Sequence, residues 1–366
     1  MKVLHIEAGR YLYGGALQVR YLMEGLKALG VENLLACPGE SEIAKAAAPF
    51  AKIIPLPMKG DADIGMTWRL KAAISTHRPD LVHLHSRRGA DSWGALAAKW
   101  AGVPAIVSRR VDNPESRLGL WLKYPLYRHV ITISEGIRSV LLQQGIAPDK
   151  VSCVRSALDP QPYLHPPADP RKALRTQYKL AEDALVIAMV AQLIPRKGHR
   201  YLLDVLPPLL QAHPHLQVLL FGQGPLEDSL REQLRQPSFV GRVQLAGFRH
   251  DLPALLGGID ILLHPADREG LGIALLQASA AAVPIIASRA GGIPEAVIDG
   301  QTGLLIQPGD TTALTQALTK LITQPTLRHQ LGQAGREYIL SQFSTAAMSA
   351  GNLAVYKKLL DESKIN

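Results

Sequence analysis

The stretch ILLHPADREGLGIALLQASAAAVPIIAS, residues 261–288, holds the pattern that decides the fold. Its apolar run 261–266 is predicted to be a strand, and the glycines of DREGLG form a loop that leads into a helix over 272–281. A second apolar run, 284–288, is predicted to be the next strand. A strand, a helix and a strand in this order are typical of a parallel sheet covered by helices.

The same alternation runs through the whole chain and predicts two parallel sheets. Before a Pro-rich stretch at 158–170 the predicted strands are 3–9, 33–38, 52–57, 81–86, 105–110, 129–134 and 151–156. After it they are 185–192, 216–222, 243–247, 261–266, 284–288 and 303–308. The length of 366 residues also favours two domains. We therefore expect α/β domains over 1–165 and 166–344, each a doubly wound sheet that binds ligands beyond the carboxyl ends of its strands.

The composition favours a globular protein with a phosphate-bearing partner. Hydrophobic residues make up 47% and charged residues 19% of the chain, and the formal net charge is +9. The segment 87–128 has eight basic residues against three acidic ones. This excess indicates either a solvated surface or contact with an acidic acceptor or a membrane. Because aromatic residues are only 5% and the basic residues are spread out, we do not expect nucleic acid as a partner.

The cysteines and the N-terminus favour a cytoplasmic protein. Cys37 and Cys153 lack metal-ligand spacing and are expected to be reduced thiols. The first residues, MKVLHIEAG, lack the apolar region and cleavage site of a signal peptide. The longest run without charge, 270–288, contains Pro284 and Gln277 and fits a short helix and a buried strand better than a membrane span.

Four glycine-bearing loops follow predicted strands and precede predicted helices. They contain Gly14-Gly15, Gly222-Gln223-Gly224, Gly270-Leu271-Gly272 and Gly291-Gly292. Glycine lets a ligand approach the backbone, and a helix N-terminus favours an anion. The second loop lacks the third glycine of a dinucleotide fingerprint, which disfavours NAD or FAD. Each loop alone is equally consistent with a plain turn.

Charged side chains accompany these loops in the second half of the chain. Arg196 and Lys197 lie between a strand and a helix and are suited to neutralising a diphosphate. Glu269 follows a strand, where a carboxylate is suited to holding a ribose diol. Their combination with the glycine loops predicts a nucleotide-diphosphate site.

The segments that carry these loops resemble the family 4 glycosyltransferases of GT-B fold. The resemblance rests on VAQLIPRKGHRYLL (190–203), LLFGQGPLEDSLREQL (219–234), the block 243–310, and GGALQVRYLMEGLKALG (14–30), and it covers nearly the whole chain. It implies two Rossmann-like domains facing each other across a cleft, a nucleotide-sugar donor, retention of the anomeric configuration and no required metal or other cofactor. It also implies that a final helix, about 345–366, packs back on the N-terminal domain.

The resemblance also assigns roles by position. Glu269 matches the first glutamate of the family's Glu-x7-Glu motif near the donor sugar, and His85 matches a histidine that faces that sugar, so these two are the catalytic candidates. For His83 a structural role is favoured. The donor-binding candidates are Gly14, Gly15, Arg196, Lys197, Gly222, Gly270, Leu271, Gly272, Ile273 and Gln277.

Three departures from the family pattern stand out. Ala191-Gln192 replaces a frequent Gly-Arg, which removes one phosphate-binding cation, and 156–159 differs from the usual hinge turn. Gln277 occupies the position where a second glutamate usually binds the ribose. An amide still hydrogen-bonds a hydroxyl, but it loses the assistance of charge.

These features predict a retaining glycosyltransferase that moves a sugar from a nucleoside-diphosphate sugar to a hydroxyl of a glycan or glycolipid. Bacterial proteins of this appearance suggest lipopolysaccharide core or another surface polysaccharide as the product, with peripheral contact at the cytoplasmic face of the inner membrane. Two alternatives stay open: a sugar-nucleotide epimerase of the same fold, and a non-catalytic protein that binds nucleotide sugars or nucleic acid.

Overall fold

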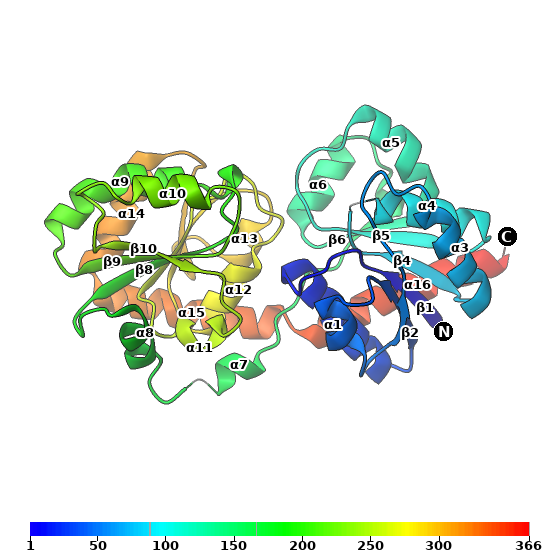
Figure 1. Ribbon diagram of the computed structural model, residues 1–366, viewed down its shortest axis with the longest axis horizontal. Coiled ribbons are helices and arrows are strands. Elements are labelled where there is room, and N and C mark those ends of the chain that lie inside the picture. The colour runs from blue at the N-terminus through cyan, green and yellow to red at the C-terminus, as the bar shows by residue number, and fades with distance from the viewer. Residues whose placement is uncertain (88, 166, 366) are drawn as a thin grey trace. The chain divides into compact units, whose positions relative to one another are not determined.

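The computed structural model describes residues 1–87, 89–165 and 167–365. The chain divides into two compact units (Figure 1). The first comprises Met1–Ala157 together with the segment from Phe343 onward, and the second comprises Leu158–Gln342. The boundary between the units therefore lies after residue 157, whereas the sequence pattern predicted it after residue 165.

Over its described residues, the first unit is built on a seven-stranded parallel sheet of order β3-β2-β1-β4-β5-β6-β7. Its strands are β1 Lys2–Ile6, β2 Glu32–Cys37, β3 Lys52–Pro55, β4 Leu81–Leu84, β5 Ala105–Arg109, β6 His129–Thr132 and β7 Val151–Cys153. Its helices are α1 Gly14–Ala28, α2 Glu42–Ala47, α3 Met66–His77, α4 Ala90–Trp100, α5 Arg117–Lys123, η1 Tyr124–Leu126, α6 Glu135–Gln143, η2 Pro148–Lys150 and α16 Thr345–Ile365.

The central strands of this sheet are buried on both faces. In β1 the residues from Val3 to Ile6 are all buried, and in β4 all four residues are buried. Such strands form continuous apolar runs because helices cover both sides of a parallel sheet. The order reverses between β1 and β4, and ligands of open α/β sheets bind at the carboxyl ends of strands at such a point.

The C-terminal helix α16 is part of the first unit and packs against α1. The approach is close, since a Cβ atom on Gly25 of α1 would lie 2.1 Å from the Ser349 hydroxyl. Tyr356 of α16 is fully buried. Its hydroxyl lies 2.6 Å from Nδ1 of His83, so the last helix completes the core beside β4.

The described part of the second unit contains a six-stranded parallel sheet of order β10-β9-β8-β11-β12-β13. Its strands are β8 Leu185–Val190, β9 Leu216–Phe221, β10 Val243–Gly247, β11 Ile261–His264, β12 Ile285–Ser288 and β13 Gly303–Ile306. Its helices are α7 Gln161–Leu164, α8 Pro170–Tyr178, η3 Pro195–Lys197, α9 His199–Ala212, α10 Glu227–Gln233, α11 Leu252–Leu256, α12 Ile273–Ala280, α13 Ile293–Ala296, α14 Thr311–Thr323 and α15 Pro325–Gln342.

The chain order of this sheet also reverses, between β8 and β11. The two strands pair in parallel, with Ile261 opposite Ile187 and Leu262 opposite Ala188. The loops that leave β8 and β11 therefore start from one edge of the sheet, and these are the loops that contain Lys197 and Glu269. Both sheets thus have the parallel α/β architecture that the alternating pattern predicted.

Cys37 is buried and Cys153 is half-buried, and both are thiols outside any disulfide. Among the described residues, every helix is too short or too polar to cross a lipid bilayer.

Candidate functional site

In the second unit, Lys197 and Glu269 form an ion pair at the carboxyl edge of the sheet. The two residues are 72 positions apart, and both charged groups are largely enclosed, with Lys197 only 8% exposed. The other carboxylate oxygen, Oε1, accepts a hydrogen bond from the backbone N–H of Gly270 at 3.1 Å. The ion pair therefore joins the two loops that the sequence predicted to bind a diphosphate and a sugar.

His264, the last residue of β11, is the third member of this group. Its Nε2 lies 2.8 Å from Oε2 of Glu269. Because an ionised carboxylate can only accept, Nε2 carries the hydrogen. Burial lowers the pKa of His264 against the opposing effect of Glu269. Its Nδ1 is buried and has no hydrogen-bond partner among the described residues. We name His264, Lys197 and Glu269 the carboxylate cluster.

Two opposing effects act on the pKa of Glu269. Burial raises it, whereas the hydrogen bond from His264 and the charge of Lys197 lower it and outweigh burial. The pKa of Glu269 is therefore well below its usual range. The carboxylate is an anion with fixed donors around it, suited to accepting hydrogen bonds from ligand hydroxyls.

The loop after β8 can approach β11 only because residue 198 is glycine. Gly198 has φ +78°, and a Cβ atom there would lie 2.0 Å from the carbonyl oxygen of Pro265. The backbone N–H of Asp267 donates to the carbonyl of Arg196 at 2.9 Å, and the Arg196 guanidinium donates to the carbonyl of Arg268 at 3.0 Å. These contacts fix the phosphate-loop cations against the loop that contains Glu269.

Close backbone packing explains the glycine at position 222 without a ligand. It has φ +137°, and a Cβ atom would lie 1.9 Å from the carbonyl oxygen of Ala191. Its backbone thus packs on the segment that follows β8. The proposed contact between Gly222 and a donor stays a prediction.

The loop 270–272 leads directly into the N-terminus of α12. Gly272 adopts φ +90° immediately before the helix, Leu271 is buried and Ile273 is half-buried. A helix start leaves backbone N–H groups without intrahelical partners, which favours an anion there. Gln277 lies one turn further along α12, is half-buried, and makes no side-chain hydrogen bond to another described residue.

In the first unit, Gly14 and Gly15 begin α1, and Arg110 directly follows β5. A Cβ atom on Gly15 would lie 3.8 Å from Cδ of Arg110, so the guanidinium stem passes beside the helix start. Burial lowers the pKa of Arg110 to about 10, which leaves it fully charged near neutral pH. This cation was not singled out from the sequence.

His85 belongs to a cluster of three buried imidazoles with His5 and His83. Nδ1 of His5 lies 2.9 Å from Nε2 of His85, and Nε2 of His83 lies 2.8 Å from the Ser108 hydroxyl. The bonds of His83 to Ser108 and Tyr356 agree with the structural role that the sequence favoured for it. Nδ1 of His85 is buried and has no partner among the residues described.

The three imidazoles are also close enough to suggest a metal site, since their ligand atoms lie within 4.8 Å of one another. Both ring nitrogens of His5 and of His83 already have hydrogen-bond partners, and Nε2 of His85 is bonded to His5. Burial lowers the pKa of His83 and His85 well below the usual value, and the positive charge of Arg110 acts in the same direction. The geometry fits a network of neutral imidazoles better than a metal centre.

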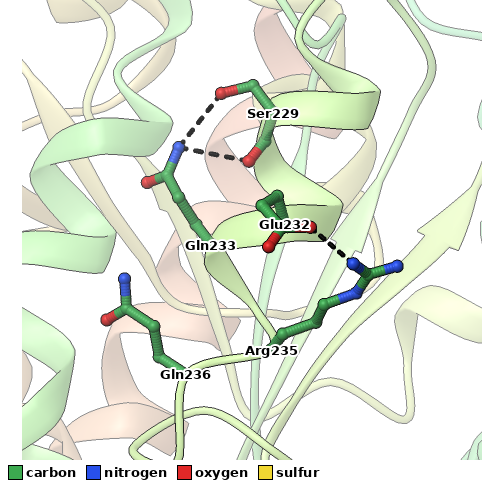
Figure 2. Close-up of a pocket in the computed structure, with 5 residues that line it drawn as sticks. All are labelled: Ser229, Glu232, Gln233, Arg235 and Gln236. Carbon is green, nitrogen blue, oxygen red and sulfur yellow. Dashed lines mark hydrogen bonds and ion pairs between the residues drawn. The ribbon is translucent and has the colours of Figure 1, made fainter.

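Apart from Gly222, the predicted site residues thus form two groups, one at a sheet edge of each unit. The edge of the second unit has Arg196, Lys197, Glu269, Gly270, Leu271, Gly272, Ile273 and Gln277, and the edge of the first has Gly14, Gly15 and His85. A surface hollow lies elsewhere, over α10 (Figure 2), and its lining consists of Ser229, Glu232, Gln233, Arg235 and Gln236. It contains no predicted site residue.

Two families match the chain. Residues 170–338 match the family described as "Glycosyl transferases group 1", and residues 13–161 match "Glycosyltransferase Family 4". The two matched segments contain all the site residues predicted from the sequence.

A curated relative and two solved structures extend these matches. A GDP-mannose-dependent alpha-(1-6)-phosphatidylinositol monomannoside mannosyltransferase of Mycolicibacterium smegmatis is 34% identical over 299 residues, which cover 78% of this chain and 74% of the relative. The Anabaena protein HepE, solved with UDP and glucose, matches with a TM-score of 0.85 at 20% identity and covers 98% of this chain and 100% of its own. WaaG, a glycosyltransferase involved in lipopolysaccharide biosynthesis, matches with a TM-score of 0.73 at 17% identity over 95% of this chain and 98% of its own.

Proposed function

This chain belongs to the family 4 glycosyltransferases of GT-B fold, and from that premise we propose that it transfers a sugar from a nucleoside-diphosphate sugar to a hydroxyl of a glycan or glycolipid. The observation that carries the proposal is the carboxylate cluster at the topological switch point of the second sheet. It combines a phosphate-binding cation with a carboxylate that binds hydroxyls, and a nucleotide sugar needs both.

In this proposal the cations of the second unit bind the diphosphate. Lys197 is held by Glu269 in the structure and has further N–H groups to offer a phosphate oxygen. Arg196 lies in the same loop, and the first N–H groups of α12 add donors. As the bond between the sugar and the diphosphate breaks, negative charge grows on the leaving phosphate. Preorganised donors aimed at that charge are often the largest catalytic contribution.

Glu269 is proposed to orient the hydroxyls of the donor sugar. Its depressed pKa and its three donors, Lys197, His264 and Gly270, make it a weak nucleophile. This favours retention by front-face attack over a covalent sugar intermediate. The acceptor hydroxyl then attacks the anomeric carbon from the side of the leaving group, and its proton passes to the departing phosphate.

The first unit is proposed to receive the acceptor. Arg110 offers donors to an acidic group, and the unpartnered Nδ1 of His85 can bond a sugar hydroxyl. The contact of Gly14 and Gly15 with the donor diphosphate stays a prediction. The mannosyltransferase relative acts on a phosphatidylinositol mannoside, a lipid with an anionic phosphate. A phosphorylated glycolipid in lipopolysaccharide core or a related surface polysaccharide is the acceptor class we favour, at the cytoplasmic face of the inner membrane.

The diphosphate is neutralised by Lys197 and Arg196 in this scheme, so we expect turnover to continue in the presence of EDTA. The most informative test is a thermal-shift panel of UDP-, GDP-, ADP- and dTDP-sugars on the full chain. One class should raise the melting temperature, and its nucleotide alone should raise it by less. If no nucleotide sugar changes the melting temperature, the donor-site assignment is wrong.

A further inference from the structure

Helix α5, Arg117–Lys123, turns three of its four large apolar side chains toward solvent. Leu118 is 64% exposed, Trp121 73% and Leu122 53%, and none of the seven residues of the helix is buried. Residues at positions i, i+3 and i+4 share one face of a helix, so the three side chains form a single outward stripe. A surface helix normally turns such a stripe inward, so this one is available for a partner.

The helix is firmly held in this orientation. Leu120, on the other side, packs against the core of the first unit. The hydroxyl of Ser116 caps the helix by accepting from the N–H of Gly119 at 3.0 Å. At the far end, the Lys123 ammonium lies 2.9 Å from a carboxylate oxygen of Asp91. The exposure of the stripe is therefore a property of the fold.

The segment that contains the stripe has a net positive charge. The segment 87–128 has eight basic residues against three acidic ones, and two of the acidic ones, Asp91 and Glu115, already face Lys123 and Arg109. Arg117 is exposed beside the stripe and forms no ion pair with a described residue. Positive charge flanking Trp and Leu is the chemistry of helices that lie in the interface of an anionic bilayer.

We propose that Leu118, Trp121 and Leu122 insert into the surface of a bilayer that contains anionic phospholipid, with Arg117 contacting the headgroups. A second copy of this chain is a poorer occupant, because two such basic faces would repel each other. The inference rests on the proposed function and deepens it. Helix α5 is reached from the carboxyl end of β5 through Arg110, so docking there brings the lipid surface to the edge where the acceptor is proposed to bind.

The test is co-sedimentation of the full chain with vesicles of equal parts phosphatidylglycerol and phosphatidylcholine, and with phosphatidylcholine alone. Wild type should partition to the anionic vesicles, and added salt should weaken the binding. Trp121→Ser should lower the partition coefficient at least roughly tenfold, because a large apolar side chain leaves the lipid. Trp68→Ser, which removes another exposed tryptophan of the same unit, is the matched control and should partition as wild type does.

Three results would overturn the proposal: no binding of wild type to anionic vesicles, equal losses in the two tryptophan variants, or a wild-type dimer that Trp121→Ser dissociates. The thermal shift by the donor sugar is measured on the same samples. An unchanged donor shift with lost vesicle binding is the expected behaviour of Trp121→Ser. A missing donor shift in wild type would contradict the proposed function separately.

Discussion

At Glu269 the burial of the carboxyl and its hydrogen bonds change the pKa in opposite directions. Burial alone would raise the pKa and favour the neutral acid, but the hydrogen bond from His264 and the charge of Lys197 keep the group ionised. Glu269 therefore depends on its neighbours for its charge. His264 is a positioning residue in this scheme, because it acts on the donor through Glu269.

Two substitutions at His264 distinguish the effect of its hydrogen bond from the effect of its volume. His264→Leu should weaken donor binding at least roughly tenfold, because the buried carboxylate loses a donor. His264→Gln, whose amide nitrogen can take the place of Nε2, should retain most of the affinity. Donor KM and kcat, measured with urea unfolding of each variant, check this. Equal losses in the two variants would show that His264 only fills space.

His199 is a second buried imidazole near this cluster, and it lowers the stability of the folded chain at acidic pH. It is 2% exposed, and neither ring nitrogen has a partner among the described residues. Burial, with a further contribution from His264 and Lys197, lowers its pKa to about 4. The folded chain thus stays unprotonated at His199 between about pH 6.5 and 4, where the unfolded chain takes up a proton. Stability from this residue is lost as the pH falls through that range.

His199→Leu should remove this dependence. At pH 7.5 the variant should differ from wild type by less than about 1 kcal/mol, since an unpartnered polar ring is replaced by an apolar side chain. At pH 5 it should be more stable by about 2 kcal/mol beyond that difference. Urea unfolding at the two pH values measures this. The same stability difference at both would mean that His199 does not stay neutral in the fold.

At the scale of elements, the site depends on two neighbouring strands and on close backbone packing. Strands β8 and β11 lie side by side, so their loops leave the same edge, and Gly198 lets one loop approach the carbonyl of Pro265. Helix α12 then starts next to the carboxylate cluster and places Gln277 one turn along. A substitution in α12 can therefore change the nucleotide contact without disturbing the ion pair.

Gln277→Glu tests whether the absent charge on α12 matters. A charged acceptor forms a stronger hydrogen bond with a ribose hydroxyl than an amide does, so nucleotide affinity should rise roughly fivefold. Gln233→Glu, on the exposed face of α10, adds the same charge elsewhere and should leave affinity unchanged. Calorimetric titration with the nucleoside diphosphate measures both. Unchanged affinity in Gln277→Glu would show that this position does not contact the ribose.

On the scale of the whole molecule, the alternating pattern predicted most of the fold. Apolar runs such as 3–9 and 185–192 coincide with most of β1 and all of β8, because strands covered on both faces are continuously apolar. The order of strands could not be predicted in this way, since pairing joins residues far apart in the sequence. Helix α5 was also missed, because its apolar stripe faces solvent and the usual inward pattern is absent.

Only the site residues that lie in loops could be predicted from the sequence. Lys197 and Glu269 were found because charged residues beside glycines at strand ends are unusual in a core. His264 and Arg110 were missed because His264 ends a buried apolar strand and Arg110 directly follows one, so the local pattern is that of a core segment. Their roles depend on contacts made by the fold, such as the 2.8 Å bond from His264 to Glu269, which no local spacing indicates.

The central claim is that Lys197 of the carboxylate cluster binds the diphosphate of a nucleotide sugar. Calorimetric titration of the stabilising nucleotide sugar into wild type, Lys197→Ala and Lys320→Ala tests it most directly. Lys320 is an exposed lysine of the same unit, on α14, and serves as the control. We predict that Lys197→Ala binds at least roughly tenfold more weakly and that Lys320→Ala binds as wild type does. Equal affinity in the two variants would contradict the account.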